Sequence, residues 1–473
     1  MSGRAASAAT GASAAGARVV TAAAPAAAEA GLRIFASGGN AFDAAVAMAL
    51  VETVALPMKC GLAGDVVALV REPDGRLRCL VSVGPGAGAL AGDGQLTDTG
   101  PCSVGVPGAP AGYARLAALG RLGLPALVAP AVEAATDGLP WSEIAVRLTA
   151  ESEALLRRHN RDTVFLPGGR VPTVGEMLRL SGMADLLRAF GEDGEKLFHG
   201  SRGEVLCERV RAAGGFLAPA DLEVEPAAWT EPMRLPLAGG AVLAATPAPT
   251  HGPALLRAVD LALHRHVDPM AAARAARHAE AEEAGGLPVG GTSLVTAAET
   301  GGAAVVLMHS NSYPHYGSGL VVNEWDLVLN NRPGRGFDTT AAASSTRAPA
   351  PGRVPPTTLH AWAYEAKDAV TLGATPGGIN QMVWNLQGIL DVAHGLPPSE
   401  VVKAPRWSLD ARDDAAVEED HAVAGRPDVR RVPPASLRSV QQIVRVETGQ
   451  VAAAADRRTG AVAATAGNQR TRP

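Results

Sequence analysis

The strongest candidate for chemistry in this sequence is Thr292, in the run Gly290-Gly291-Thr292-Ser293-Leu294-Val295-Thr296. If the peptide bond before a mid-chain threonine is cut, its new α-amine has an ordinary pKa of roughly 7.7 to 8.0 and can take the proton of the same residue's Oγ. Thr292 would then supply both the nucleophile and the base, without a histidine or carboxylate partner. Taken alone, the run also fits a loop that ends at a strand.

Further motifs accompany Thr292 along the chain. After it stand His309-Ser310-Asn311-Ser312, Tyr316-Gly317-Ser318-Gly319-Leu320, Leu329-Asn330-Asn331-Arg332 and Gly373-Ala374-Thr375-Pro376-Gly377-Gly378. Before it stand Ala36-Ser37-Gly38-Gly39-Asn40-Ala41-Phe42-Asp43-Ala44-Ala45, Gly61-Leu62-Ala63-Gly64-Asp65, Val106-Pro107-Gly108, Gly214-Gly215-Phe216-Leu217 and Pro247-Ala248-Pro249-Thr250-His251-Gly252. In order and spacing these motifs resemble the γ-glutamyltransferase family of N-terminal-nucleophile hydrolases. The resemblance covers nearly the whole chain.

The resemblance implies an α+β fold, the αββα four-layer sandwich of the N-terminal-nucleophile hydrolase type. It divides the chain into a large subunit, residues 18–291, and a small subunit, residues 292–473, which form one intertwined domain. Residues 1–17 are rich in Ala, Ser and Gly, which bury too little surface to offset the entropy of ordering. We therefore expect them to be a disordered tail.

The resemblance also assigns roles around the nucleophile. Cleavage between Gly291 and Thr292 would proceed by attack of Thr292 Oγ on the Gly291 carbonyl, an N-to-O acyl shift and hydrolysis of the ester. Ser310, eighteen positions downstream, would place a hydroxyl beside the nucleophile, and the N–H groups of Gly377 and Gly378 would stabilise the oxyanion. The alternative for the glycine pair is a simple turn, and for the whole chain an uncut, inactive relative.

Two histidines follow the nucleophile without an assigned role. His309 and His315 are tempting as bases, but the chemistry of an N-terminal threonine needs no histidine. We expect both to be supporting or surface groups.

The candidate substrate-binding residues depart from the family pattern. Family members hold the donor's carboxylate with an arginine after the first hairpin, but residues 81–87 contain none. Where the family has an acidic residue for the donor's amine, this chain has Arg332 and Arg335. A cation about 4 Å from an ammonium costs on the order of 4 kcal/mol at an effective dielectric of about 20, whereas a guanidinium suits a carboxylate. Both arginines also fit solvent-facing loop positions.

Four polar residues complete the substrate-binding candidates. Asn311 or Ser312 would take the polar position that follows Ser310, and Thr357 and Thr358 keep hydroxyls where the family has a serine pair.

Composition narrows the partners and the location. A net charge of -5 argues against a nucleic-acid partner, and no stretch approaches the ~20 apolar residues of a membrane span. The four cysteines show neither metal-ligand spacing nor a dense disulfide pattern, which fits a reducing compartment. We read no signal peptide in the first thirty residues and expect a cytoplasmic protein with no metal or organic cofactor.

Hydrophobic patterns and chain breakers predict the elements that position these residues. Strands are expected at 19–23, 66–71, 77–83, 241–245, 293–297, 303–308, 320–322 and 369–374, and helices at 25–37, 40–54 and 384–394. Asn40 is a candidate helix cap. Residues 108–265 should be mainly helical, 263–290 one helix and a linker, and 444–455 with 461–464 a late hairpin.

These observations favour an autoprocessing threonine hydrolase or acyltransferase that acts through an acyl-Thr ester on a small, non-standard substrate, a carboxylated amide or acyl compound. Its two fragments would stay associated. The alternatives are a biosynthetic enzyme of specialised metabolism that cleaves an amide or carbon-carbon bond, and an uncleaved binding or structural relative.

Overall fold

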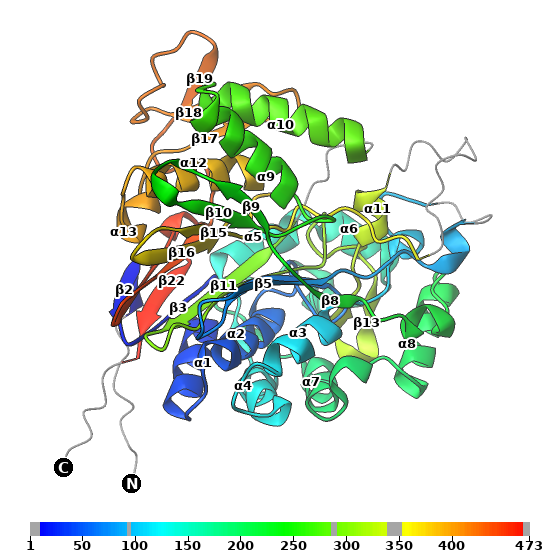
Figure 1. The fold of residues 1–473 in the computed structure, drawn as a ribbon. Helices are drawn as coiled ribbons and strands as arrows, with labels where there is room; N and C mark the ends of the chain where they lie inside the picture. The colour runs from blue at the N-terminus through cyan, green and yellow to red at the C-terminus, as the bar shows by residue number, and fades with distance from the viewer. Residues whose placement is uncertain (1–9, 92–95, 285–290, 338–351, 467–473) are drawn as a thin grey trace, which may run out of the picture.

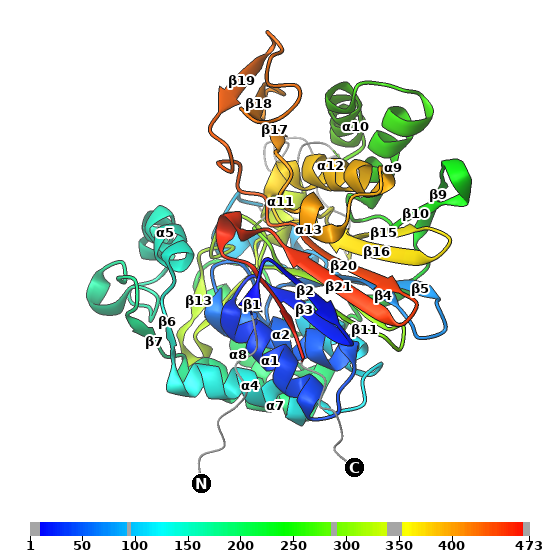
Figure 2. The ribbon, with the colours of Figure 1, turned by 90° about the vertical axis from the view of Figure 1, so that its left-hand side faces the viewer.

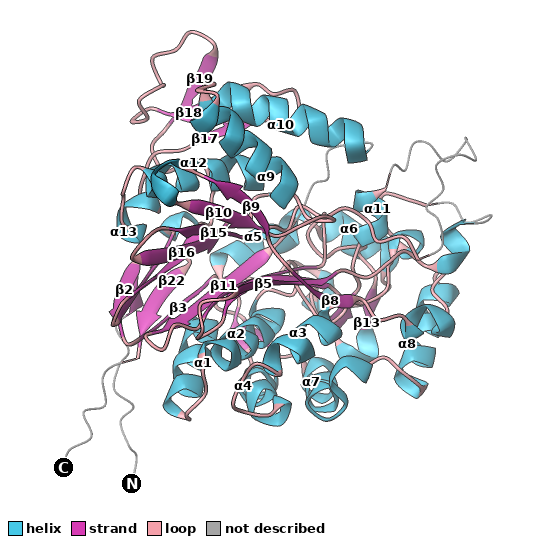
Figure 3. Ribbon diagram, in the orientation of Figure 1, coloured by secondary structure: helices cyan, strands magenta, loops and turns pink. Residues whose placement is uncertain are grey.

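Two antiparallel sheets lie face to face between two layers of helices (Figures 1 and 3). The computed structural model describes residues 10–91, 96–284, 291–337 and 352–466. Within them, the eight-stranded first sheet has the order β1 (Thr10–Gly11), β22 (Val462–Thr465), β3 (Arg18–Ala22), β11 (Ser293–Glu299), β12 (Ala304–Ser310), β4 (Asp65–Arg71), β5 (Leu77–Ser82) and β8 (Ala227–Thr230). The seven-stranded second sheet has the order β2 (Ser13–Gly16), β21 (Gln450–Ala455), β20 (Gln442–Glu447), β16 (Ala369–Ala374), β15 (Trp362–Glu365), β10 (Val242–Ala245) and β9 (Met233–Pro236).

The helices cover the outer face of each sheet, so the expected αββα sandwich is confirmed (Figure 2). Against the first sheet pack α1 (Pro25–Ala36), α2 (Ala41–Ala55) and α3 (Ala109–Ala117), while α4 (Leu124–Asp137) packs behind α2 and α7 (Ser181–Asp193) packs against α4. Against the second pack α9 (Gly252–Val259) and α12 (Gln381–Ala393), and α10 (Pro269–Ala284) packs on these two helices. The remaining helices are α5 (Glu143–Glu151), α6 (Glu153–His159), α8 (Ser201–Ala212), α11 (Arg332–Gly336) and α13 (Pro398–Val401).

In the described part of the chain, three smaller sheets lie outside the sandwich. One contains β17 (Trp407–Leu409), β18 (Ala415–Glu418) and β19 (Val429–Val432), and it extends beyond α12 (Figure 2). The others are the pairs β13 (Val321–Val322) with β14 (Leu327–Val328) and β6 (Leu139–Pro140) with β7 (Met177–Leu178). No helix within the described residues combines the length and apolar character that a bilayer crossing requires.

Helix α2 is the central support of the first sheet. Its cap is as expected, because the Asn40 side chain accepts the N–H groups of Phe42 and Asp43 while Asp43 accepts the N–H of Asn40. Nearly every residue of α2 is buried, including Glu52. A helix that is apolar on all faces must lie inside the molecule, and α2 packs between other helices and strands β11 and β12.

Two expectations near the chain ends are wrong. Residues 10–16 are not a disordered tail, because β1 pairs with β22 and β2 pairs with β21. The partner strands supply backbone hydrogen bonds, so these segments are ordered although their side chains are small. Residues 1–9 lie outside the described residues. The late hairpin is β20 with β21, in the second sheet. Strand β22 instead pairs with β3 in the first sheet, so the chain crosses between the sheets after β21.

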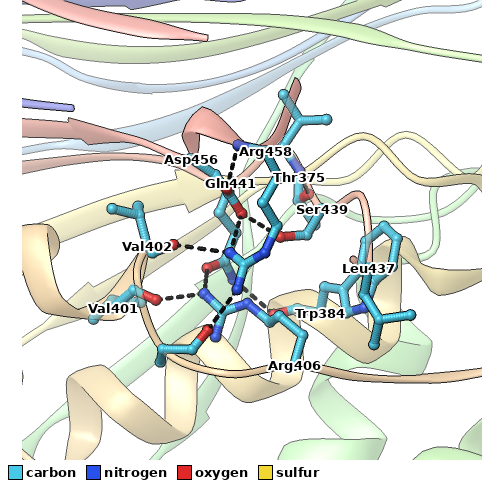
Figure 4. Close-up of polar contacts among 12 residues, drawn as sticks. Thr375, Trp384, Val401, Val402, Arg406, Leu437, Ser439, Gln441, Asp456 and Arg458 are labelled. Atoms are coloured by element: carbon cyan, nitrogen blue, oxygen red, sulfur yellow. Dashed lines mark hydrogen bonds and ion pairs between the residues drawn. The ribbon is translucent and has the colours of Figure 1, made fainter. Parts of the chain in front are cut away.

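Buried hydrogen bonds and ion pairs of Arg406 and Arg458 stabilise the region of this crossover (Figure 4). Arg458 donates to Asp456 Oδ2 at 2.9 Å, to Glu418 Oε2 at 3.1 Å and to the carbonyl of Val402 at 3.2 Å. Arg406, whose side chain is fully buried, donates to Gln441 Oε1 at 2.6 Å and to the carbonyl of Val401. The network joins β18, α13 and the end of β21.

Replacing Arg458 by methionine should destabilise the fold, because Glu418 and Asp456 would keep buried charges without the guanidinium that pairs with both. Breaking such a pair costs about 3–5 kcal/mol. An unfolding entropy of ~2.1 cal/mol/K per residue makes this a drop of about 3–5 °C in Tm for a chain of 473 residues. Calorimetry would check it, with the exposed neighbour Arg457→Met as the control; equal Tm values for the two variants would contradict the role of the network.

Candidate active site

Thr292 lies just before β11, a central strand of the first sheet, with its side chain almost fully buried. Gln381, the first residue of α12, donates from Nε2 to Thr292 Oγ1 and to Thr358 Oγ1, both at 3.2 Å. The helical layer of the second sheet therefore reaches the candidate nucleophile on the first. Gln381 is not among the predicted site residues, because the helix is expected to begin at residue 384; its one signal in the sequence is its place three residues after Gly378.

Strand register brings Ser310 to the expected scissile bond. Strands β11 and β12 pair with Ser293 opposite His309, which sets Thr292 opposite Ser310. Ser310 Oγ donates to the Gly291 carbonyl oxygen in a very short contact and accepts the N–H of Ser312 at 2.8 Å. The N–H of Gly291 donates to the carbonyl of Ser312 at 3.3 Å. The carbonyl that Thr292 would attack is thus already polarised by a hydroxyl; Gly290 lies outside the described residues.

Asn311 and Ser312, the polar candidates after Ser310, point in different directions. Asn311 Nδ2 donates to the carbonyl of Pro57 at 3.2 Å, and its side chain packs against Gly61 and Gly64. Ser312 Oγ is buried and has no hydrogen-bond partner within the described residues. Ser312 therefore keeps a free hydroxyl beside Gly291, whereas Asn311 is engaged by the loop after α2.

Gly377 and Gly378 form the turn that leads from β16 into α12. Gly377 has φ 149° and Gly378 has φ 59°, which favour glycine. A Cβ on Gly377 would lie 2.2 Å from Cζ3 of Trp384, so no side chain fits there. Neither N–H donates to an acceptor among the described residues. The turn ends three residues before Gln381, the hydrogen-bond partner of Thr292.

Thr357 and Thr358 have separate surroundings. Thr358 joins the site through Gln381, while Thr357 Oγ1 accepts the N–H of Leu359 at 3.2 Å. His360 Nδ1 donates to the carbonyl of Thr358 at 2.7 Å, and its Nε2 lies 2.9 Å from Asn385 Nδ2. Of the two threonines, Thr358 is therefore the one that shares Gln381 with Thr292.

The two candidate arginines differ in burial and partners. Arg332 is buried, and its Nε lies 2.7 Å from Asp65 Oδ2. The alternative of a solvent-facing side chain is wrong for Arg332. Burial raises the pKa of the Asp65 carboxyl, and Arg332 opposes that rise. Arg335 donates to the Tyr313 carbonyl at 3.2 Å, and its guanidinium lies 5.5 Å from the centre of the Tyr313 ring. Arg335 is thus held by the loop that follows Ser310.

A fully buried polar chain supports the start of β11 from behind. Glu52 Oε2 accepts the hydroxyl of Ser293 at 2.5 Å and lies 3.0 Å from His309 Nε2, while Oε1 accepts the N–H of Ala23 at 2.7 Å. His309 Nδ1 lies 2.7 Å from the Tyr113 hydroxyl. His309 is therefore a supporting group, as expected, and not a surface one.

The same cluster includes a cysteine, so its fit to a metal ion can be judged. Atoms of Glu52, Cys60 and His309 lie within 4.8 Å of one another. Burial, and next the charge of Glu52, raises the pKa of the Cys60 thiol well above its ordinary value, and metals bind the thiolate. Hydrogen bonds already engage Glu52 and His309. The donor set fits a hydrogen-bonded support better than a metal site.

Replacing Glu52 by alanine should weaken the support of Thr292. Three buried donors would lose their acceptor, and each unsatisfied group costs about 1–3 kcal/mol. We expect a Tm several degrees lower together with slower formation of the two fragments. Glu52→Gln keeps one carbonyl oxygen and should fall between; an unchanged Tm for both variants would argue against this network.

Comparison with known proteins places this arrangement in a family. A family model described as gamma-glutamyltranspeptidase matches residues 27–285 and 261–466. The acylase ACY 1 proenzyme of Pseudomonas sp. (strain V22) is 31% identical over 247 residues, which cover 48% of this chain and 44% of that protein. The oxamate amidohydrolase proenzyme of Klebsiella pneumoniae is 26% identical over 447 residues, covering 81% of this chain and 83% of that protein.

Solved structures agree with the sequence comparison. The crystal structure of cephalosporin acylase from Bacillus halodurans matches with a TM-score of 0.79 and 26% identity, over 94% of this chain and 95% of that one. Glutathione hydrolase 2 of Arabidopsis thaliana is 28% identical over 48% of this chain. This chain spans less than half the length of the acylase ACY 1 and glutathione hydrolase relatives. The family model matches most of the length of this chain, and the fold agrees, so the chain belongs to the gamma-glutamyltranspeptidase family.

Proposed function

We propose that the protein cuts its own chain between Gly291 and Thr292 and then uses Thr292 as the nucleophile of a hydrolase or acyltransferase. The observation that carries this proposal is the geometry of the uncut bond: Thr292 Oγ1 is held by Gln381, and the carbonyl of Gly291 is held by Ser310. Once the bond is cut, the free α-amine of Thr292 is the base for its own hydroxyl.

The catalytic cycle follows from the same contacts. Thr292 Oγ attacks the substrate's acyl carbon and its proton passes to the α-amine, which then gives this proton to the leaving group as the acyl-Thr ester forms. The N–H groups of Gly377 and Gly378 stabilise the oxyanion. The hydroxyl of Ser310 can donate or accept a hydrogen bond beside the nucleophile. Water, or an amine, then attacks the ester and releases Thr292.

The proposed substrate is a small carboxylated amide or acyl compound. Arg335, in α11, is a cation held by Tyr313 of the loop that follows Ser310 and carries Ser312, whereas the buried Arg332 is neutralised by Asp65. An ammonium next to Arg335 would be repelled, which disfavours a γ-glutamyl donor. Oxamate, named for the relative that covers 81% of this chain, is an amide that bears a carboxylate, which supports this substrate class.

Cleavage of an acylated amine is the second candidate. The cephalosporin acylase structure covers 94% of this chain at 26% identity, and the chain also matches acylase ACY 1. A biosynthetic reaction that cleaves an amide or carbon-carbon bond would use the same acyl-Thr ester.

Substrate panels distinguish these possibilities. We expect oxamate and related α-carboxylated amides to be hydrolysed and a chromogenic γ-glutamyl anilide to be turned over weakly or not at all. Mass spectrometry of the quenched reaction should find the acyl group on Thr292. Fast turnover of the γ-glutamyl anilide would refute the role given to Arg335, and turnover of acylated amines alone would favour the second candidate.

The two fragments should remain together after the cut. Strands β3 and β4, from before the cut, flank β11 and β12, from after it. In addition, Arg277 of α10 is buried and lies 3.0 Å from Asp413 Oδ1, beyond the cut. Separating the fragments would expose both sheets, so we expect them to elute as one species in gel filtration.

A further inference from the structure

The first cleavage needs a base that the mature enzyme no longer needs. In the uncut chain the nitrogen of Thr292 belongs to a peptide bond, and an amide nitrogen is not basic. The α-amine that serves later turnover therefore cannot take the Oγ proton during self-cleavage. This step, and the inference below, rests on the proposed function.

His315 lies next to the scissile residue. A Cβ on Gly291 would be 3.4 Å from His315 Nδ1 and 2.9 Å from the carbonyl oxygen of Ser312. The Nδ1 atom is buried and has no hydrogen-bond partner among the described residues. Ser152 Oγ donates to the His315 carbonyl at 3.3 Å, which fixes the backbone of this loop. An unpartnered ring nitrogen is thus held beside Gly291, whose peptide bond to Thr292 must break.

Most other polar groups around Thr292 cannot serve as the base, because they are not basic or already have hydrogen-bond partners. Gln381 is an amide and cannot act as a base, and the Ser310 hydroxyl donates to the Gly291 carbonyl. Glu52 accepts three hydrogen bonds in the network behind β11. Both nitrogens of His309 have partners in that network. Among the described residues near the bond, Ser312 Oγ also lacks a partner, but a hydroxyl is a much weaker base than an imidazole, so His315 is the group that can take the proton.

The charge state of His315 suits this role. Burial lowers the pKa of its imidazole to about 4, and the positive charges of Lys59 and Arg147 act in the same direction. The Tyr313 ring also packs against it, with the ring centres 6.0 Å apart. At neutral pH the imidazole is therefore uncharged and can accept a proton.

We propose that His315 is the proton carrier of self-cleavage. As Thr292 Oγ bonds to the Gly291 carbonyl carbon, the hydroxyl proton moves to His315 Nδ1. His315 then returns this proton to the Thr292 nitrogen as the carbon–nitrogen bond breaks, leaving an ester between Gly291 and Thr292 Oγ. Water hydrolyses the ester to a Gly291 carboxylate and a free Thr292.

The test follows self-cleavage of freshly synthesised precursor. His315→Gln should slow the appearance of the two fragments by roughly 10²- to 10⁴-fold, the usual contribution of a general acid–base. His315→Ala should be equally slow and should regain cleavage when imidazole is added, because the small ring can enter the space left by the side chain. A change that only disturbed the fold would not respond to imidazole. His199→Gln, whose Nδ1 lies 3.8 Å from Glu223, is the matched control.

The pH dependence gives a readout that is independent of the variants. Cleavage of the wild-type precursor should be nearly constant from about pH 5.5 to about pH 8 and should fall as the pH drops toward the lowered pKa of His315, where the base becomes protonated. A rate that instead falls through an ordinary histidine pKa near ~6.5 contradicts the proposal.

The outcomes separate this inference from the proposed function. If Thr292→Ala stays uncut while folded His315→Gln is cut at the wild-type rate, His315 is not the proton carrier and the proposed function stands. If Thr292→Ala is itself cut normally, the proposed function fails. Cleavage of His315→Ala that imidazole does not accelerate also overturns the proposal.

Discussion

Replacing Thr292 by alanine is expected to leave one full-length chain where the wild-type protein gives two fragments. The methyl side chain cannot attack the Gly291 carbonyl, although Ser310 still polarises it. Activity on any substrate should fall by roughly 10⁴-fold or more, the scale of removing a nucleophile from an enzyme. A denaturing gel and N-terminal sequencing of the small fragment, which should begin at Thr292, measure both effects.

Two control variants accompany this experiment, one with the same substitution at another threonine and one that keeps a hydroxyl at position 292. Thr300→Ala removes an exposed threonine beyond the end of β11 and should cleave normally. Thr292→Ser keeps both the hydroxyl and the future α-amine, so it should form fragments. Two fragments from Thr292→Ala would show that the scissile bond lies elsewhere.

Replacing Gly377 by alanine is expected to lower kcat by about 10²- to 10³-fold, the cost of losing an oxyanion donor. The added Cβ would lie 2.2 Å from the Trp384 ring, so the turn must move and carry its N–H groups with it. Self-cleavage should be retained, because the Gly291 carbonyl is held by Ser310 rather than by this turn. Gel analysis and steady-state kinetics of the mature protein would separate the two effects.

A second glycine tests whether backbone strain alone explains the loss. Gly395 has φ 86° and open space around it, so Gly395→Ala strains the backbone without a clash and away from the turn. We expect its kcat to be near that of the wild type. Equal losses for both variants would mean that Gly377 serves the fold and not the oxyanion.

The local elements were largely predictable from the sequence. The capped helix α2, the hairpin of β4 with β5 and the strands after Thr292 follow from hydrophobic periodicity and turn residues, which are local properties of the chain. The αββα architecture and the position of Ser310 came from the resemblance, because the pairing of β11 with β12 turns a spacing of eighteen residues into a contact.

Long-range pairing was not visible in the sequence. Strands β1 and β2 consist of small residues, and their order comes from β22 and β21, more than four hundred residues away. Likewise, nothing local shows that β22 leaves the sheet of β21, since both segments have the same alanine-rich pattern.

The sequence by itself determined the nucleophile candidate, its glycine neighbour and the family to which the motifs point. Only the tertiary structure decided which polar groups meet there: Gln381 from the opposite helical layer contacts Thr292, Asp65 neutralises Arg332, and His315 is left with an unpartnered nitrogen beside Gly291. The physical reason is that burial and charge pairing depend on which segments pack together, and these segments are distant in the chain.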